Sequence, residues 1–267
     1  MESSPVSPAR SPSRNRPRPA RILGSTIGLA ILLATLFNLW TPSRGLFAGT
    51  FSDKLSLLLT AQPESNVIAT PLPQLRIGIV AGHAGNDSGA ICRDANGNVS
   101  LTEADVNLNI ASRVQKTLTE AGYQVDLLNE FDTRLNGYRA VALVSIHNDS
   151  CEYINDEATG FKVAAAVNTH DFNRATRLTE CLRDRYQNIT GLRFHAGSIT
   201  NDMRGYHAFS EIDPNTIAAI IETGFLNLDQ DLLVNQTDKV AYGVAQGILC
   251  FVRNENVEPT PLPPYAP

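Results

Sequence analysis

Residues 76–83 read RIGIVAGH, residues 141–147 read VALVSIH and residues 217–222 read IAAIIE. Each is a short apolar run of the kind that forms a buried strand. Each ends on a side chain that can bind a metal or move a proton: His83, His147 and Glu222. In an open α/β sheet, binding and catalytic residues lie at the carboxyl ends of the parallel strands. If the three strands run in the same direction, two imidazoles and a carboxylate meet at one edge of the sheet without long loops.

Strands and helices alternate through the rest of this region. Thr102 suits the N-cap of a helix, apolar residues then recur every four positions from 106 to 118, and Gly122 is a stop signal. Further strands are predicted at 123–128 and 161–167, and further helices over 172–186 and 240–248. This alternation predicts an α/β fold: a single domain with a mainly parallel, helix-flanked sheet and the functional site at the C-terminal edge of the strands.

A fourth candidate, Glu103, opens the predicted helix and therefore lies at the same edge. Two histidines and two glutamates that converge in this way are typical of a hydrolytic zinc site. Each also has a structural explanation, because a single histidine beside a strand is usually packed or solvated and the helix dipole favours an acid in the first turn. Glu222 directly follows an apolar strand, where an ionised carboxylate needs a partner. The other histidines lie in polar segments and are interpreted as surface residues, with His207 the first to re-examine: His170, His195 and His207.

The two ends of the chain differ from the central region in composition. Five arginines crowd residues 1–21, and residues 22–40 form an uncharged stretch that is long enough to span a bilayer. The arginine excess predicts an N-terminus in the cytoplasm and a catalytic domain outside it. We expect an uncleaved signal anchor; a buried core helix is the structural alternative, and cleavage would make the protein secreted. The predicted parts are a basic cytoplasmic segment (1–21), a transmembrane signal anchor (22–40), a stalk (41–74), a catalytic domain (75–254) and a proline-rich tail (255–267).

Overall charge and composition exclude some functions. The 267-residue chain has a net charge of -5, which gives no reason to expect nucleic acid as a partner, and the arginine-rich start makes the remainder more acidic still. Its hydrophobic content of 43% and charged content of 18% are those of an ordinary globular protein. The sequence therefore indicates a small secreted or anchored enzyme.

Four motifs resemble those of the zinc-dependent N-acetylmuramoyl-L-alanine amidases of the amidase-3 type, which are bacterial cell-wall hydrolases. They are VAGHAGNDSGA (80–90), EADVNL (103–108), VSIHN (144–148) and IETGFLN (221–227), in the family's order. The resemblance covers essentially all of residues 75–254. It implies one zinc ion per chain on His83, Glu103 and His147, with an open fourth position for water, and catalysis by Glu222.

The same resemblance implies peptidoglycan as substrate and hydrolysis of the amide between N-acetylmuramic acid and L-alanine. Arg204 is a candidate for holding a stem-peptide carboxylate, although a surface salt bridge explains it equally well. Two other functions stay open: a zinc amidase or carboxypeptidase acting on another peptide bond, and an inactive peptidoglycan-binding module. An inactive module would be expected to lack one of the four site residues, and all four are present.

The sequence departs from the family pattern in its loops. The acidic residue often found shortly before the first histidine is replaced by Val80-Ala81, and the loop at 92–100 lengthens the stretch from His83 to Glu103. Residues 131–140 are too few for the full helix that many relatives have there. Only residues 149–160 follow the second histidine before the next strand, too few for the helical plug of division-type relatives. We therefore expect no obligatory activator protein.

All four cysteines lie beyond the predicted membrane segment and so face a non-reducing exterior. Cys92 and Cys151 both belong to loops at the active-site edge, whereas Cys181 and Cys250 lie within helices. This placement predicts a Cys92–Cys151 disulfide. By closing a loop in the unfolded chain, it would stabilise the folded state by about 4 kcal/mol in the chain-entropy model. The alternative is four unpaired thiols, with the two helical cysteines as small core residues.

Overall fold

The computed structural model describes residues 29–33 and 74–257. The chain divides into two units, Met1–Thr70 and Pro71–Pro267. In the first unit residues 29–33 are helical, and none of the helices in the described ranges has the length and apolar character needed to cross a membrane. The predicted cytoplasmic segment, most of the predicted anchor, nearly all of the stalk and most of the proline-rich tail lie outside the described residues.

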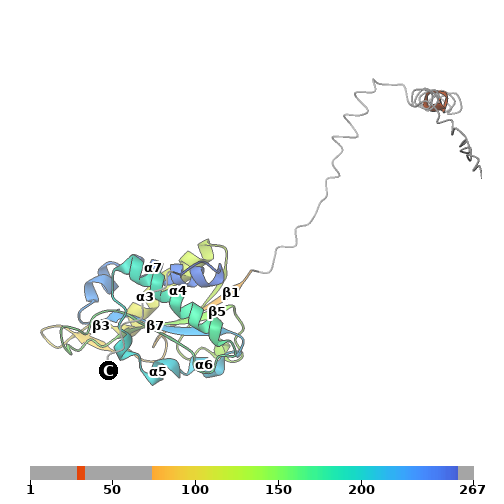
Figure 1. The fold of residues 1–267 in the computed structure, drawn as a ribbon. Coiled ribbons are helices and arrows are strands. Elements are labelled where there is room, and N and C mark those ends of the chain that lie inside the picture. Colours follow the sequence, from red (N-terminus) through yellow and green to blue (C-terminus); the bar gives the residue numbers. More distant parts are fainter. Residues whose placement is uncertain (1–28, 34–73, 258–267) are drawn as a thin grey trace, which may run out of the picture. The chain divides into compact units, whose positions relative to one another are not determined.

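A five-stranded sheet forms the centre of the second unit (Figure 1). Its strands, in the order in which they lie side by side, are β4 (Gln124–Leu128), β1 (Arg76–Ala81), β5 (Ala142–Asp149), β7 (Ile217–Phe225) and β6 (Lys162–Ala165). Strands β4, β1, β5 and β7 are parallel, and only the edge strand β6 runs antiparallel to its neighbour. The prediction of a mainly parallel α/β sheet is confirmed.

Alternation along the strands gives the sheet two different faces. On β1, Ile77 and Ile79 pack with the long helices α3 (Glu103–Glu120), α4 (Phe172–Thr190) and α7 (Thr237–Val252). Val80 points to the opposite face, where the covering is thinner. That face is covered by the short helices η1 (Thr133–Leu135), α5 (Asn201–Arg204) and α6 (Ala208–Glu211). The described part of the second unit also contains the short helices η2 (Ala196–Ser198) and η3 (Asp231–Asn235).

Two of the strands run further than the sequence predicted. β5 continues through His147 to Asp149, and β7 continues through Glu222 to Phe225, because backbone pairing between them persists after the side chains become polar. His147 and Glu222 are register partners on these parallel strands. Counting by twos from the buried residues places both side chains on the face covered by α5 and α6.

The segment expected to be a loop at 92–100 is instead part of a two-stranded hairpin, β2 (Ile91–Arg93) and β3 (Val99–Thr102). Its turn is organised by Asp94, whose carboxylate accepts hydrogen bonds from the backbone N–H groups of Asn96 and Asn98, both at 2.9 Å. The hairpin leads directly into α3. Thr102 caps that helix as predicted and accepts a hydrogen bond from the N–H of Asp105 at 3.2 Å.

Two disulfides tie the domain together. Cys92 on the hairpin is joined to Cys151 in the loop after β5, which is the pairing that the sequence predicted, with a Cα–Cα distance of 5.3 Å. The second joins Cys181 on α4 to Cys250 on α7, at 5.7 Å, and both cysteines are fully buried. The hairpin is therefore covalently attached to the segment that follows His147.

Candidate metal centre

His83 is held at the end of β1 in a conformation that few side chains adopt. Its φ angle is +64°, in the left-handed region. The preceding glycine makes room for the second histidine, because a Cβ at Gly82 would lie 2.3 Å from the Nε2 and Cε1 atoms of His147. The AGHAG stretch therefore brings the backbone of one candidate ligand against the ring of another.

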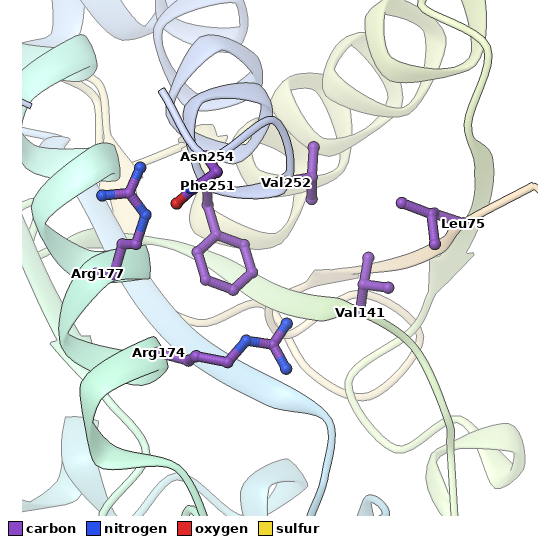
Figure 2. A pocket seen from close by; sticks show the side chains of 7 residues that line it. All are labelled: Leu75, Val141, Arg174, Arg177, Phe251, Val252 and Asn254. Carbon is purple, nitrogen blue, oxygen red and sulfur yellow. The ribbon is translucent and has the colours of Figure 1, made fainter. Parts of the chain in front are cut away.

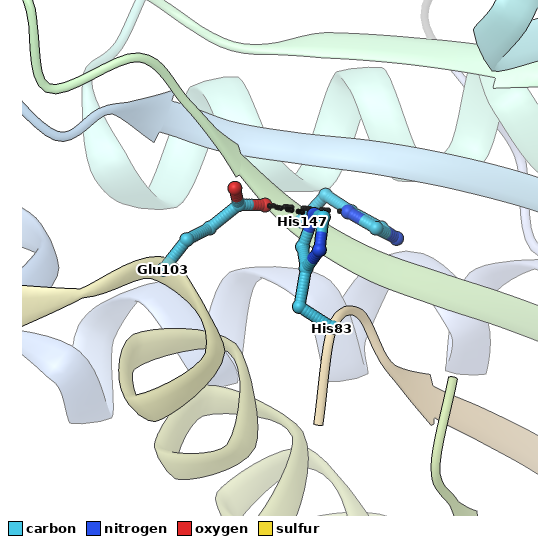
Figure 3. A group of neighbouring side chains, drawn as sticks. All are labelled: His83, Glu103 and His147. Carbon is cyan, nitrogen blue, oxygen red and sulfur yellow. Dashed lines mark hydrogen bonds and ion pairs between the residues drawn. The ribbon is translucent and has the colours of Figure 1, made fainter. Parts of the chain in front are cut away.

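Glu103 reaches both histidines from the first turn of α3. Its Oε1 atom lies 3.3 Å from Nε2 of His83 and 3.3 Å from Nδ1 of His147 (Figure 3). The other oxygen accepts the N–H of Ala90 at 3.0 Å. A Cβ at Gly89 would lie 2.5 Å from that oxygen, so this glycine also leaves room for the carboxylate. The side chain is 6% exposed and is held on all sides.

The structure thus brings His83, Glu103 and His147 together as a group. One ligand atom from each lies within 4.8 Å of the others. Imidazole nitrogen and carboxylate oxygen are donors that zinc accepts, and three protein ligands leave a fourth position open in a tetrahedral site. The donor set and the space kept by the two glycines fit a zinc ion.

Hydrogen bonding within this group shifts the pKa values of its members. The hydrogen bond to Glu103 raises the pKa of His83 to about 9, although burial opposes the change. Burial favours the neutral acid at Glu103, but hydrogen bonds from His147 and His83 hold the pKa of its carboxyl well below the usual range. Burial has the largest effect on the pKa of His147 and lowers it, but the hydrogen bond to Glu103 and the negative charges of Glu222, Glu103 and Glu130 together outweigh burial, so the net shift is upward. The cluster stabilises positive charge between the rings, where a cation would bind.

Glu222 lies beside this group without belonging to it. Its neighbour across the β5–β7 ladder is His147, and its Oε2 atom is buried with no hydrogen-bond partner among the residues that the structure describes. Burial raises the pKa of its carboxyl to about 7, against the opposing positive charges of His147 and Lys162. A carboxyl that titrates near neutrality is suited to take up and return a proton.

Lys162 flanks Glu222 on the other side. It is its register partner on the antiparallel strand β6, its side chain is 6% exposed, and its ammonium forms an ion pair with Asp149. The row His147, Glu222, Lys162 therefore crosses three adjacent strands on one face of the sheet. Sequence reasoning missed Lys162, because the pairing of β6 with β7 brings it there from 60 residues away.

Glu130 and His207 are the other site residues that the sequence analysis did not find. Glu130 follows the end of β4, is 6% exposed, and accepts the backbone N–H of His83 at 2.7 Å. Nε2 of His207 lies 3.0 Å from its other oxygen. The expectation that His207 is a surface residue is wrong, because it is partly buried and contacts Glu130. His170 is exposed as expected. Glu130 could have been found from the sequence by asking which polar side chains follow the strand predicted at 123–128, as was done for His83, His147 and Glu222.

Buried amides connect the site to the strands behind it. Asn107 donates to the carbonyl of Gly82 at 2.9 Å and accepts from the side-chain amide of Asn148 at 2.7 Å. Thr223 in turn donates to the side-chain oxygen of Asn148 at 2.5 Å. This chain of hydrogen bonds joins α3, β5 and β7 directly behind the candidate ligands.

The predicted substrate residue Arg204 is exposed at the end of α5. It is close in sequence to Tyr206, whose ring centroid is 5.3 Å from that of His147. Arg204 is therefore an exposed residue two positions before a ring that contacts a candidate ligand.

Several cavities lie among the described residues of the domain, and two of them are considered for the site. One of about 390 Å³ adjoins the Cys92–Cys151 disulfide and the segment after β7; its lining includes Arg93, Ser100 and Asn227. The other, of about 360 Å³, lies where β1 and β5 begin (Figure 2). Its lining residues are Leu75, Val141, Arg174, Arg177, Phe251, Val252 and Asn254. Because this second lining holds no carboxylate, histidine or cysteine, it offers no candidate for acid–base or metal chemistry.

Comparison with known proteins extends what the geometry indicates. The family model described as N-acetylmuramoyl-L-alanine amidase (Amidase_3) matches residues 77–252. No match is found among curated proteins.

Solved structures with a similar fold include the following amidases. N-acetylmuramoyl-L-alanine amidase AmiC2 of Nostoc punctiforme is 23% identical with a TM-score of 0.51, over 67% of this chain and 97% of that one. An N-acetylmuramoyl-L-alanine amidase from Clostridium difficile 630 is 22% identical with a TM-score of 0.53, over 68% and 99%. The CwlD amidase from Clostridioides difficile, solved in complex with the GerS lipoprotein, is 20% identical with a TM-score of 0.53, over 68% and 100%. At these identities the likeness shows the fold.

Proposed function

Because the chain belongs to the N-acetylmuramoyl-L-alanine amidase family of the Amidase_3 type, we propose that it cleaves peptidoglycan as a zinc enzyme. The bond is the amide between the lactyl group of N-acetylmuramic acid and L-alanine of the stem peptide. The observation that carries the proposal is the convergence of His83, Glu103 and His147 within 4.8 Å, beside Glu222, whose buried Oε2 atom has no hydrogen-bond partner among the described residues.

Each residue has a distinct role in this reaction. His83, Glu103 and His147 hold the metal, which when bound supplies Lewis acidity for the scissile carbonyl and lowers the pKa of water. Glu222 removes a proton from the attacking water and returns it to the nitrogen of L-alanine as the C–N bond breaks. The products are a lactyl carboxylate and a free amine. Burial raises the pKa of Glu222 to about 7, which suits it to both steps.

The position of the site suggests how the substrate lies. The cavity near the Cys92–Cys151 disulfide adjoins the segments that follow β5 and β7, so we assign it to part of the glycan or stem peptide. The exposed Arg204, on the α5 side of the site, is assigned to a stem-peptide carboxylate. Both assignments concern binding, and neither alters the chemistry.

We also propose that the catalytic domain acts outside the cytoplasm, anchored by residues 22–40. The support is the uncharged length of that stretch and the five arginines that precede it. The two disulfides agree with a non-reducing compartment.

No activator is required in this proposal. The described segment between β5 and β6 contains no helix that could cover the candidate ligands. The purified chain is therefore expected to release product from sacculi without a second protein. Complete inactivity that a partner protein relieves would contradict this.

Replacing Glu222 by glutamine tests the division of roles. The amide keeps the shape but cannot accept a proton, so turnover should fall about 10²–10⁴-fold while zinc stays bound at one ion per chain. His147→Ala serves as the contrasting variant and should lose both metal and activity, because it removes a direct ligand. Loss of zinc from the Glu222→Gln variant would make Glu222 a ligand and overturn the assignment.

A further inference from the structure

The two histidines of the candidate metal centre each have a second nitrogen that faces away from Glu103. Nδ1 of His83 lies 2.7 Å from the carboxylate of Asp87, whose side chain is 55% exposed. Nε2 of His147 is buried and has no hydrogen-bond partner among the described residues. The carboxylate of Glu130 lies near this nitrogen, with its Oε2 atom 3.7 Å away.

Glu130 is held firmly in this place. Its side chain is 8% exposed, Oε2 accepts the N–H of His83 at 2.7 Å, and Oε1 lies 3.0 Å from Nε2 of His207. His207 is fixed in turn by Glu211, 2.8 Å from its Nδ1, and by the ring of Phe131, stacked at 4.2 Å. The carboxylate of Glu130 is therefore fixed in position next to His83 and His147.

A metal at Nδ1 of His147 leaves the proton on Nε2, and that N–H then needs an acceptor in a buried site. A shift of roughly 0.5–1 Å would bring Nε2 and Oε2 of Glu130 to hydrogen-bond distance. The same oxygen already holds the N–H of His83, whose left-handed backbone persists only if its surroundings fix it. The carboxylate of Glu130 can thus contact both the ring of His147 and the backbone of His83.

We propose that Glu130 is a positioning residue of the metal centre, which orients the ring of His147 through Nε2 and fixes the backbone of His83. The proposal rests on the zinc site proposed above and assigns Glu130 no contact with the metal. Nε2, the atom that Glu130 faces, is not the His147 nitrogen that faces Glu103. Asp87 has the corresponding place at His83, but its exposure to water makes its contribution the smaller one.

Zinc affinity of the full-length chain, measured by competition with a chromogenic chelator, tests the proposal without reference to amidase activity. Glu130→Gln should bind zinc about 10–100-fold more weakly, Glu130→Asp should recover part of the loss, and Asp87→Asn should lose less than Glu130→Gln. Glu120→Gln at the far, exposed end of α3 is the matched control and should bind as the unaltered chain does. The cobalt-substituted Glu130→Gln variant should also show a shifted d–d absorption spectrum.

The outcomes separate this inference from the proposed function. An unaltered chain that binds no zinc would remove the metal site itself, and this inference with it. Zinc binding that is unchanged in Glu130→Gln, or two zinc ions per chain, would overturn the positioning role alone. If Glu130→Gln does not fold, ¹⁵N shifts of His147 in the unaltered zinc-loaded chain decide: a hydrogen-bonded proton on Nε2 supports the role, and its absence refutes it.

Discussion

Removal of the Lys162 ammonium should destabilise the domain more than the loss of one surface ion pair would. The ammonium pairs with Asp149, lies opposite Glu222, and sits 5.4 Å above the centroid of the Phe225 ring. Its side chain is 6% exposed and that of Asp149 is 24% exposed. Lys162→Met keeps most of the side-chain volume and leaves Asp149 without its cation.

The magnitude follows from this burial. Breaking a fully buried pair by removing one partner costs about 3–5 kcal/mol. Water reaches Asp149 in part and recovers some of that energy, so we expect a loss of about 2–3 kcal/mol in the free energy of unfolding. The double variant Lys162→Met/Asp149→Asn has no orphaned charge and should recover at least half of the loss. Urea unfolding at pH 7 of the metal-free unaltered protein, the single variants Lys162→Met and Asp149→Asn, and the double variant measures both quantities.

Two results would contradict a stabilising interaction between Lys162 and Asp149. One is a single variant Lys162→Met within about 0.5 kcal/mol of the unaltered protein, the range of ordinary surface changes. The other is a double variant whose loss equals the sum of the two single losses, since residues that interact must deviate from additivity.

The same variant should change the pH dependence of catalysis. The positive charge of Lys162 lowers the pKa of Glu222, which burial raises to about 7. Without that charge the pKa rises further, so Glu222 becomes ionised only at higher pH. The acid limb of kcat/KM should therefore move to higher pH in Lys162→Met, and a limb that moves to lower pH would contradict the sign of the interaction.

Two further predictions concern the metal centre. Gly82→Ala should cost about 1–3 kcal/mol and weaken zinc binding on the order of tenfold or more, because its Cβ would lie 2.3 Å from the ring of His147. Gly197→Ala, where the added Cβ meets nothing within 4 Å, is the control and should leave zinc titrations unchanged; equal effects in both variants would refute the steric argument. Zinc affinity should rise with pH up to about 9, because the proton that His83 holds below that pH must leave when the metal binds. Calorimetry in buffers of different ionisation enthalpy should detect the released proton at pH 7. A zinc affinity that does not change between pH 6 and pH 9 would show that no proton on His83 competes with the metal.

Sequence patterns were sufficient for the elements that carry the candidate ligands. The apolar runs before His83 and His147 are buried strands because nearly every side chain in them is apolar, and such a pattern survives any tertiary arrangement. Glu103 was placed correctly because Thr102 marks the start of its helix by local hydrogen bonding alone.

Features that depend on distant partners could not be predicted in the same way. Glu130 is buried through contacts with His83 and with His207, which is 77 positions further along the chain. Lys162 reaches Glu222 because β6 turns antiparallel, and strand direction leaves no local mark in the sequence. The hairpin at 91–102 has short and largely exposed strands, so its sequence shows no apolar run.

The proposed reaction is hydrolysis of the amide between N-acetylmuramic acid and L-alanine with the help of zinc. Mass spectrometry of purified peptidoglycan digested by the full-length protein measures this most directly, with a chelator, and with zinc restored. We predict glycan strands with free lactyl carboxylates and stem peptides that begin with an unblocked L-alanine, lost with chelator and regained with zinc. Cleavage at a different peptide bond would contradict the proposed substrate bond, and the same products at full rate in the presence of chelator would contradict the role of zinc.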